Sequence, residues 1–276
     1  MYTNHDFEND CLEIFRNCDG NTVDVPGAGR TVIYEEPLIG FAAASDSLFE
    51  KYRDKKAIGV EFMGPREWLP GAETVISLFL PFTEAVRESN RKDPSDPSTE
   101  WLYARIEGQD FIGKFMAALK SCLEGKGMTA CVPSSDERFD RKIEMTLNGL
   151  KPDFHADSRW SERHAAYACG LGTFGLSKGL ITEKGMAGRF ASIIISEKLE
   201  PAERPYTGIY DYCINCGACV RRCPVNAISL SRGKNNLTCH LHVQKMGRKY
   251  SPRYGCGKCQ VAVPCEHARP LKAGQK

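Results

Sequence analysis

The sequence predicts an α+β fold for most of the chain, followed by a small cysteine-rich module. Three observations lead to this prediction. The 276 residues are 42% hydrophobic and 26% charged, a composition that allows a sizeable buried core. Apolar patterns typical of helices and of strands both occur before residue 200. Eight of the 13 cysteines lie between Cys213 and Cys265. We therefore expect an α+β domain over residues 1–204 and a metal-binding module over residues 205–276.

The elements of the first domain are predicted in chain order from these patterns. Residues 7–17 and 45–56 are expected to form short helices, and the continuous apolar run Glu73–Phe82 is typical of a buried strand. The polar segment Arg87–Ser98 contains two prolines and predicts a surface loop. Residues 101–124 carry apolar side chains at helical spacing, so we expect a long amphipathic helix, followed by a short strand.

The second half of this domain is predicted to contain one helix and one hairpin. Ser161 is a candidate N-cap for a helix that runs to Cys169, and the glycine that follows is a candidate helix stop. Residues 180–183 and 189–196 flank a Lys-Gly turn, which favours a β-hairpin. The proline-rich stretch Glu200–Tyr206 is the expected boundary. The module beyond it has too few apolar residues to fold without its metals.

The cysteine spacing in the module is that of a bacterial ferredoxin. The run C-x2-C-x2-C-x3-C ends in proline, and in this motif the fourth cysteine binds a different cluster from the first three. We therefore expect two [4Fe–4S] clusters. The predicted ligands of the first cluster are Cys213, Cys216, Cys219 and Cys265. The predicted ligands of the second cluster are Cys223, Cys239, Cys256 and Cys259.

Zinc is the alternative metal for such a module, because zinc ribbons also use paired C-x2-C motifs. The unbroken four-cysteine run followed by proline favours the iron–sulfur interpretation. The other five cysteines are expected to be small buried side chains rather than ligands.

Charge is distributed unevenly along the chain. Residues 205–276 contain twelve Lys and Arg against two acidic residues, a formal charge of +10, whereas the whole chain carries only +2. A basic segment can indicate RNA contact, but it also offsets the negative charge of clusters bound by four thiolates. No apolar stretch approaches the roughly 20 residues of a membrane span. The N-terminal residues lack the parts of an export signal, so a cytoplasmic protein without membrane contact is expected.

Several motifs ahead of the module occur together. Asp157-Ser158 is followed by the segment Glu162–Gly175, which reads ERHAAYACGLGTFG, and by Leu180-Ile181. Further upstream stand Tyr103-Ala104-Arg105 and Asp110-Phe111. With the cysteine run, this combination resembles the family of epoxyqueuosine reductases and reductive dehalogenases. The resemblance spans roughly residues 70–267.

The resemblance implies a nitroreductase-like α+β domain that holds base-off cobalamin beside one of two clusters. It implies that Asp157 or Tyr103 supplies the catalytic proton. It also implies a set of cofactor-binding residues, namely Ser158, Arg163, Gly170, Leu171, Gly172, Thr173 and Gly175. A low-potential donor such as ferredoxin or flavodoxin would supply electrons, and a small molecule is the expected substrate.

Three differences from the family argue against tRNA as the substrate. Asp157 lies one residue closer to Glu162 than in epoxyqueuosine reductases, the D-Y-H stretch reads Asp110-Phe111-Ile112, and eleven residues follow Cys265. Two other functions stay open at this point. One is a dicluster electron carrier or electron-transfer subunit without cobalamin, and the other is a flavin-dependent reductase.

Overall fold

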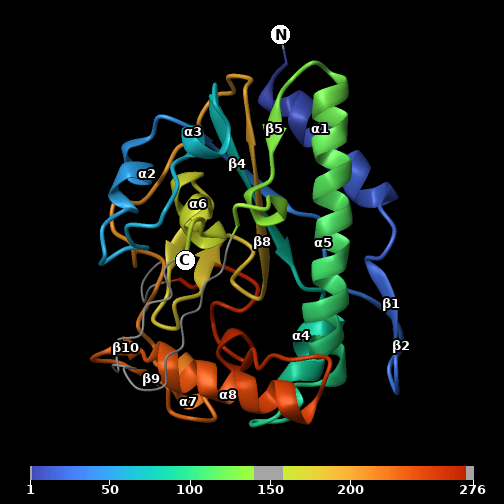
Figure 1. Ribbon diagram of the computed structural model, residues 1–276. Helices are drawn as coiled ribbons and strands as arrows, with labels where there is room; N and C mark the ends of the chain where they lie inside the picture. Colours follow the sequence, from blue (N-terminus) through green and yellow to red (C-terminus); the bar gives the residue numbers. More distant parts are fainter. Residues whose placement is uncertain (1, 140–157, 272–276) are drawn as a thin grey trace.

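A four-stranded antiparallel sheet lies between two helical layers in the computed structural model, which describes residues 2–139 and 158–271 (Figure 1). The strand order is β3 (Leu38–Ala43), β4 (Thr74–Pro81), β8 (Gly188–Ile195) and β5 (Ala130–Cys131). All eight residues of β4 are buried. Both faces of this strand are covered, which explains why its sequence is a continuous apolar run. The chain is therefore a mixed α/β protein.

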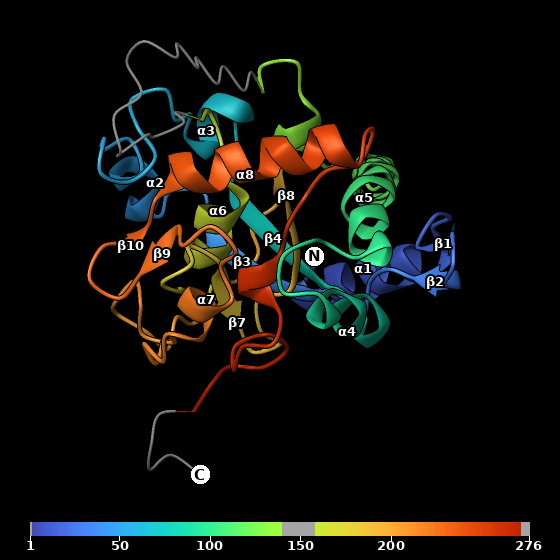
Figure 2. The same ribbon diagram turned by 90° about the horizontal axis from the view of Figure 1, so that it is seen from below.

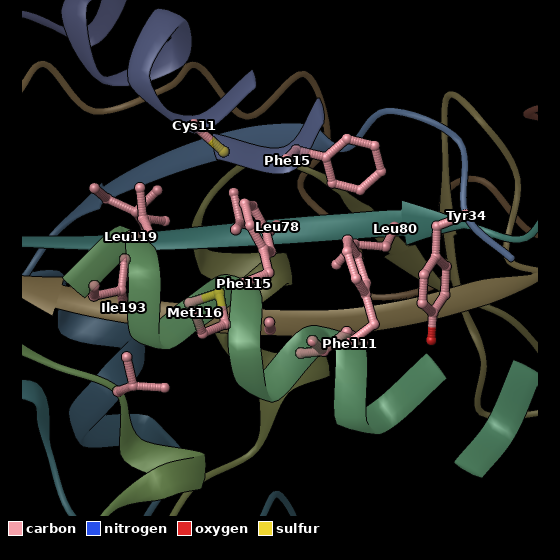
Figure 3. Packing of buried hydrophobic residues seen from close by; sticks show 14 of the residues in the cluster. Cys11, Phe15, Tyr34, Leu78, Leu80, Phe111, Phe115, Met116, Leu119 and Ile193 are labelled. Atoms are coloured by element: carbon pink, nitrogen blue, oxygen red, sulfur yellow. The ribbon is translucent and has the colours of Figure 1, made fainter. Parts of the chain in front are cut away.

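The long helix α5 (Thr99–Gly125) and the N-terminal helix α1 (Asn4–Asn17) cover one face of the sheet. Figure 3 shows Phe111 and Phe115 of α5 pointing toward Leu78 and Leu80 of β4, with Phe15 of α1 beside them. The ring of Phe15 meets that of Phe111 edge to face at 5.5 Å between centroids. This packing confirms the predicted amphipathic helix. Next to this layer, β1 (Thr22–Val25) and β2 (Gly29–Val32) form a separate hairpin.

A second helical layer lies on the opposite face. It consists of α2 (Ser47–Lys51), α3 (Pro65–Trp68) and α6 (Glu162–Ala168), and η1 (Pro133–Ser135) follows β5. Trp160 is the centre of this layer, because its ring stacks on Phe49 and Phe62. The indole Nε1 of Trp160 donates to Ser192 Oγ of β8 at 2.8 Å. The segment that leads into α6 is thereby fixed to the sheet.

The cysteine-rich module lies across one end of the sheet. It contains α7 (Ala218–Arg221), β9 (Ile228–Ser229), β10 (Gly233–Lys234), α8 (Asn236–Lys249) and η2 (Lys258–Gln260). Figure 2 shows α8 running from the side of α2 toward α5, below the ends of β4 and β8. Within the two described stretches of the chain, no helix has the length and apolar character needed to cross a membrane.

The predicted surface loop over Arg87–Ser98 is wrong in its first half. The structure forms helix α4 (Glu84–Lys92) there, and Arg87, Ser89 and Asn90 are buried. Their polarity suggested exposure to solvent. Asn90 and Arg87 are buried because they contact polar groups of the module, and Ser89 because it bonds to Val86 O and Ser98 Oγ.

The predicted hairpin over residues 180–196 is also wrong. Strand β7 (Leu180–Thr182) pairs with β6 (Gly172–Phe174), whereas β8 pairs with β4 and β5. The turn between β7 and β8 binds the end of the module instead. Backbone N–H groups of Met186 and Ala187 donate to the carbonyl oxygens of Cys265 and Glu266, each at 3.0 Å. The chain thus leaves β7 for a different sheet.

Candidate cluster and cofactor site

The eight cysteines of the module line two separate hollows. The first group, here called the outer quartet, lines a small pocket and comprises Cys213, Cys216, Cys219 and Cys265. The second group, the inner quartet, lines a cavity of about 490 Å³ and comprises Cys223, Cys239, Cys256 and Cys259. None of the eight is in a disulfide. The structure therefore brings the cysteines together in the two sets expected from the sequence.

The outer quartet lies at the surface around α7. Gly217, with φ of +69°, adopts the left-handed conformation that starts this helix directly after Cys216. Cys216 is exposed, whereas the other members are partly buried. Burial, reinforced by the neighbouring thiols, raises the pKa of Cys219 to about 11 and that of Cys265 to about 12. These thiols therefore need a nearby cation to ionise at neutral pH, as a metal centre would provide.

The inner quartet lies below the sheet, between α5, α6 and α8. Cys239 stands in the first turn of α8, and Cys223 Sγ accepts a hydrogen bond from Ala227 N at 3.1 Å. Burial raises the pKa of Cys256 to about 11. The two quartets adjoin, because the pKa of Cys219 is also raised by Cys259 of the inner quartet. The two sets of cysteines are therefore neighbours in the structure.

Two glycines allow the Cys256 segment to lie flush against α5. A Cβ on Gly257, with φ of +69°, would stand 2.1 Å from the ring of Trp101. A Cβ on Gly255, with φ of +149°, would stand 2.9 Å from Arg105 Cδ. Larger residues would push Cys256 away from the cavity. The pattern G-C-G-x-C carries this signal in the sequence, although the motif analysis did not use it.

Helix α4 of the first domain holds both quartets in place. Glu266, 3% exposed, follows Cys265 of the outer quartet and accepts hydrogen bonds from Arg91 Nη2 and Ala262 N, each at 2.6 Å. On the inner side, Asn90 Nδ2 donates to the carbonyl of Cys256 at 3.1 Å. The buried Lys258 Nζ donates to the backbone and side-chain oxygens of Asn90 at 2.8 and 2.9 Å. The ligand geometry therefore depends on a helix far away in the sequence.

The cavity beside the inner quartet has aromatic and cationic walls. The aromatic wall residues are Phe82, Trp101, Phe139, Trp160 and Phe190. Three arginines from three different elements also line it, namely Arg105 of α5, Arg163 of α6 and Arg189 of β8. Burial and the nearby Arg189 lower the pKa of Arg163, and Cys259 and Cys239 raise it in part. The cavity lining thus includes both the four cysteines of the inner quartet and three arginines.

His242 is a further wall residue that the motif analysis missed. It follows Cys239 by three positions on α8, so both side chains lie on the same side of the helix and line the cavity. Its Nε2 is buried and has no hydrogen-bond partner among the described residues. Burial and Lys245 lower the pKa of His242, which keeps the imidazole neutral at pH 7. The i, i+3 spacing from a ligand cysteine was the available sequence signal.

Of the residues expected to hold a cofactor, Ser158 and Arg163 line the cavity. Gly170 ends α6 with φ of +82°, and Leu171 is buried in the core. Gly172 has φ of +157°, and a Cβ there would stand 1.9 Å from the carbonyl oxygen of Ile181. This glycine is required by the pairing of β6 with β7.

The remaining two expected cofactor residues lie on the side of the outer quartet. Thr173 is fully buried, and its Oγ1 accepts a hydrogen bond from Tyr212 N at 2.8 Å. Gly175 lines the small pocket of the outer quartet. The glycine-rich segment 170–175 therefore contacts the module on the side of the outer quartet. It is not among the described residues that line the cavity.

The two candidate proton donors have different settings. Asp157 lies outside the described residues, directly before Ser158 in the sequence. Tyr103 is on α5, and the guanidinium of Arg253 lies 3.6 Å from its ring centroid. Tyr103 is not among the described residues that line the cavity. Arg253 is held over the ring by an ion pair with Glu107.

Comparisons with known proteins agree with this arrangement. Residues 206–229 match the family model of the 4Fe-4S binding domain. No curated protein sequence matches the chain.

Among solved structures, the chain is similar to epoxyqueuosine reductase from Bacillus subtilis, with a TM-score of 0.54 and 16% identity over 97% of this chain and 67% of that chain. An epoxyqueuosine reductase with a tRNA stem loop gives 0.55 and 17% over the same shares of each chain. A reductive dehalogenase described as B12-dependent gives 0.54 and 14% over 85% of this chain, but over 30% of its own length. At these identities the comparison establishes the fold. The chain therefore has the fold shared by epoxyqueuosine reductases and reductive dehalogenases, with a 4Fe-4S binding motif in its C-terminal quarter.

Proposed function

We propose that this protein is an iron–sulfur reductase in which two [4Fe–4S] clusters, one in each quartet, deliver electrons to an organic cofactor in the cavity. The observation that carries this proposal is that the inner quartet forms part of the wall of a large cavity. An electron carrier needs only its clusters and a docking surface. A cavity of about 490 Å³ directly beside the ligands is the arrangement expected of an enzyme that uses the electrons in place.

The cysteine geometry supports clusters rather than zinc. A structural zinc ion draws four ligands to about 2.3 Å from one point. Four thiols around a hollow suit a cluster, in which each ligand binds a different iron. The ferredoxin spacing and the match to the 4Fe-4S binding domain support the same assignment.

A corrinoid is the organic cofactor that we favour. Flat aromatic walls suit a broad ring system, and Ser158 and Arg163 are the cavity residues that would bind polar groups at its edge. A similar dehalogenase is described as B12-dependent. When bound, the corrinoid would supply a strongly reducing cobalt centre. A flavin is the alternative, in keeping with the nitroreductase-like shape expected for this domain, which stays a prediction.

A proton must accompany the reduction, because negative charge develops on the substrate. We propose Asp157 as the donor, since it directly precedes the cavity residue Ser158. Tyr103 is the alternative donor. Asp157 would need burial against the cofactor to raise its pKa. The substrate is then a small molecule that fits the rest of the cavity.

The outer quartet is where we propose that electrons enter. Cys216 is exposed beside Leu230, whose side chain would lie 3.5 Å from a Cβ on Gly217. Leu230 is itself 57% exposed, and Arg221 Nη1 donates to the carbonyl of Cys216 at 3.3 Å. An apolar and basic patch of this kind fits a small acidic electron carrier such as ferredoxin or flavodoxin.

The test is an assay of iron, cobalt and flavin in protein purified without oxygen and then incubated with cobalamin or with flavin. We expect about eight irons per chain for two [4Fe–4S] clusters and stoichiometric cobalt after exposure to cobalamin. Eight irons with neither cobalamin nor flavin bound would leave the electron-carrier function. Bound flavin without cobalt would establish the flavin enzyme. Turnover of Asp157→Asn and Tyr103→Phe, with clusters and cofactor verified, then assigns the proton donor.

A further inference from the structure

We infer that the cavity contains a binding site for an oxyanion, built by Arg105 and Arg189, and that the substrate of the proposed reductase carries a carboxylate or phosphate group. The part of this inference that concerns the substrate rests on the proposed function. The anion site itself follows from the charges on the cavity wall.

Three cations face this cavity from three separate elements. Arg105 comes from α5, Arg163 from α6 and Arg189 from β8. Burial, and then Arg189 and Arg163, lower the pKa of Arg105 to about 10. Arg105 therefore remains charged at neutral pH, and Arg189 and Arg163 are near enough to repel its guanidinium group. Lys234 adds a fourth positive charge to the lining.

One described carboxylate, Glu162 of α6, lines the same cavity, against the three arginines and Lys234. Within residues 2–139 and 158–271, none of the three is part of an ion pair. Two partly buried arginines elsewhere do have such partners. Arg91 pairs with Glu266 at 2.6 Å, and Arg253 pairs with Glu107. Among the described residues, the cavity lining thus carries more positive than negative side chains, and neither Arg105 nor Arg189 is in an ion pair with a carboxylate.

Neutral groups fix the direction of two of these arginines. Arg105 Cζ lies 4.7 Å from the ring centroid of Tyr254, and Gly255 leaves room for its side chain. Arg189 Nη2 donates to the amide oxygen of Gln109. An aromatic ring and an amide orient a guanidinium but leave its charge in place. An oriented guanidinium without a carboxylate is suited to bidentate binding of a carboxylate or phosphate.

The clusters are the competing explanation, since their thiolates are also negative. Cys239 and Cys259 raise the pKa of Arg163, so the charge of Arg163 offsets part of the negative charge of the inner thiolates. The groups that shift the pKa of Arg105 are Arg189, Tyr254 and Arg163, without a cysteine among them. Arg105 and Arg189 are therefore the residues that we assign to the anion.

The experiment measures binding of inorganic phosphate, and separately of benzoate, to cluster-loaded protein without cobalamin, by calorimetry at low ionic strength. We expect at least one anion to bind, and Arg105→Gln and Arg189→Gln each to weaken its binding at least tenfold. Arg105→Lys should recover part of the loss. The matched control is Arg30→Gln, because Arg30 is an exposed arginine of β2 far from the cavity in sequence and fold.

Four outcomes would overturn the inference. The first is that neither anion binds the wild-type protein at millimolar concentration, and the second is that the two variants bind it unchanged. The variants could instead shift the cluster reduction potentials and leave anion binding intact, which would assign the arginines to the clusters. The cofactor is a further source of an oxyanion, because the nucleotide of cobalamin carries a phosphate. Binding of cobalamin is therefore compared with binding of cobinamide, which lacks this nucleotide. Weaker binding of cobalamin alone in the variants, without an effect on free anions, would assign the site to the cofactor and not to the substrate.

These outcomes are separate from failure of the proposed function. Anion binding is measured with clusters present and cobalamin absent, so it does not require a corrinoid. A protein that binds no cobalamin but binds phosphate through Arg105 and Arg189 would retain the anion site and lose the corrinoid assignment.

Discussion

The inner and outer quartets each consist of four cysteines and come from one interleaved motif, but their surroundings differ. The outer quartet lines a small, largely apolar pocket at the surface, and Cys216 is exposed. The inner quartet lies below the sheet, next to a cavity with charged and aromatic walls. In the proposed function this difference gives the module a direction. Electrons from a partner would enter at the accessible quartet and would be used at the enclosed quartet.

The strongest test of this direction compares Cys216→Ser with Cys256→Ser. Each variant should lose one cluster, so iron should fall from about eight to about four per chain. Loss of the inner cluster should abolish reduction of a cavity-bound cofactor by any donor. Loss of the outer cluster should block reduction by a protein donor, whereas a small reductant such as titanium citrate should still reach the inner cluster. Equal behaviour of the two variants with both donors would contradict the assigned direction.

The second prediction concerns the anchor of the outer quartet. Glu266→Gln removes the charge that Arg91 and Arg87 contact in a buried site. Breaking one partner of a buried ion pair costs about 3–5 kcal/mol of unfolding free energy. We expect this loss in denaturant unfolding, together with preferential release of the outer cluster.

The control for this variant is Glu183→Gln. Glu183 pairs with Arg269 at 3.3 Å, but its side chain is 63% exposed. An exposed pair contributes about 1 kcal/mol or less. A loss as large in Glu183→Gln as in Glu266→Gln would show that burial of the anchor has no special effect.

The third prediction uses two glycines with the same backbone conformation. Gly257 follows Cys256 of the inner quartet, and Gly217 follows Cys216 of the outer quartet. Both glycines have φ of +69°. Alanine at either position bears a left-handed strain of about 1–2 kcal/mol. At Gly257 the new Cβ would also overlap the ring of Trp101, whereas at Gly217 the nearest atom is Arg221 Nη1 at 3.4 Å.

Overpacking against a ring adds about 1–3 kcal/mol. Gly257→Ala should therefore lose more unfolding free energy than Gly217→Ala, and it should release iron from the inner quartet first. The measurement is cluster absorbance during denaturant unfolding. If the two variants are equally stable, the close approach of the Cys256 segment to α5 is not a constraint.

The smallest expected effect concerns His164, whose pKa responds to the positive charge of Arg163 on the cavity wall. Burial and the neighbouring Arg163 lower the pKa of His164 from its usual 6.5 to about 4. The unfolded chain therefore binds a proton at this residue that the folded chain excludes between these two values. Stability should fall as pH decreases from about 6.5 toward 4, by about 1 kcal/mol between pH 7 and 5.5.

Unfolding titrations of the cluster-loaded protein at these two pH values measure this loss. His164→Gln should remove that part of the pH dependence. Arg163→Gln should raise the pKa of His164 and reduce the loss. An unchanged pH dependence in both variants would mean that His164 does not report the charge on the cavity wall.

Several elements could be predicted because their signal is local. The apolar run of β4 and the helical spacing of α5 identify these elements directly. The ferredoxin spacing predicted the division of the cysteines into the two groups that the structure brings together. The resemblance to epoxyqueuosine reductases and reductive dehalogenases is confirmed at the level of fold.

Other elements were mistaken because their partners are distant. Helix α4 reads as a polar loop, yet Asn90 binds the carbonyl of a cysteine 166 positions later. The turn after β7 reads as a hairpin, yet its N–H groups bind the end of the module. The glycines of segment 170–175 match a cofactor motif, but Gly172 is required by the close approach of Ile181. A local pattern does not report which remote groups will satisfy a buried donor or fill a space.

The sequence by itself determined the 4Fe-4S binding motif, since residue type and spacing are encoded within a few residues of the chain. It also determined the central strand and the long helix, whose periodicity is local. Only the tertiary structure decided which quartet faces the cavity and which faces solvent. It alone placed Arg105, Arg163 and Arg189 together on one wall. The physical reason is that charge and burial at a site are sums over residues far apart in the chain, and folding brings these residues within range of one another.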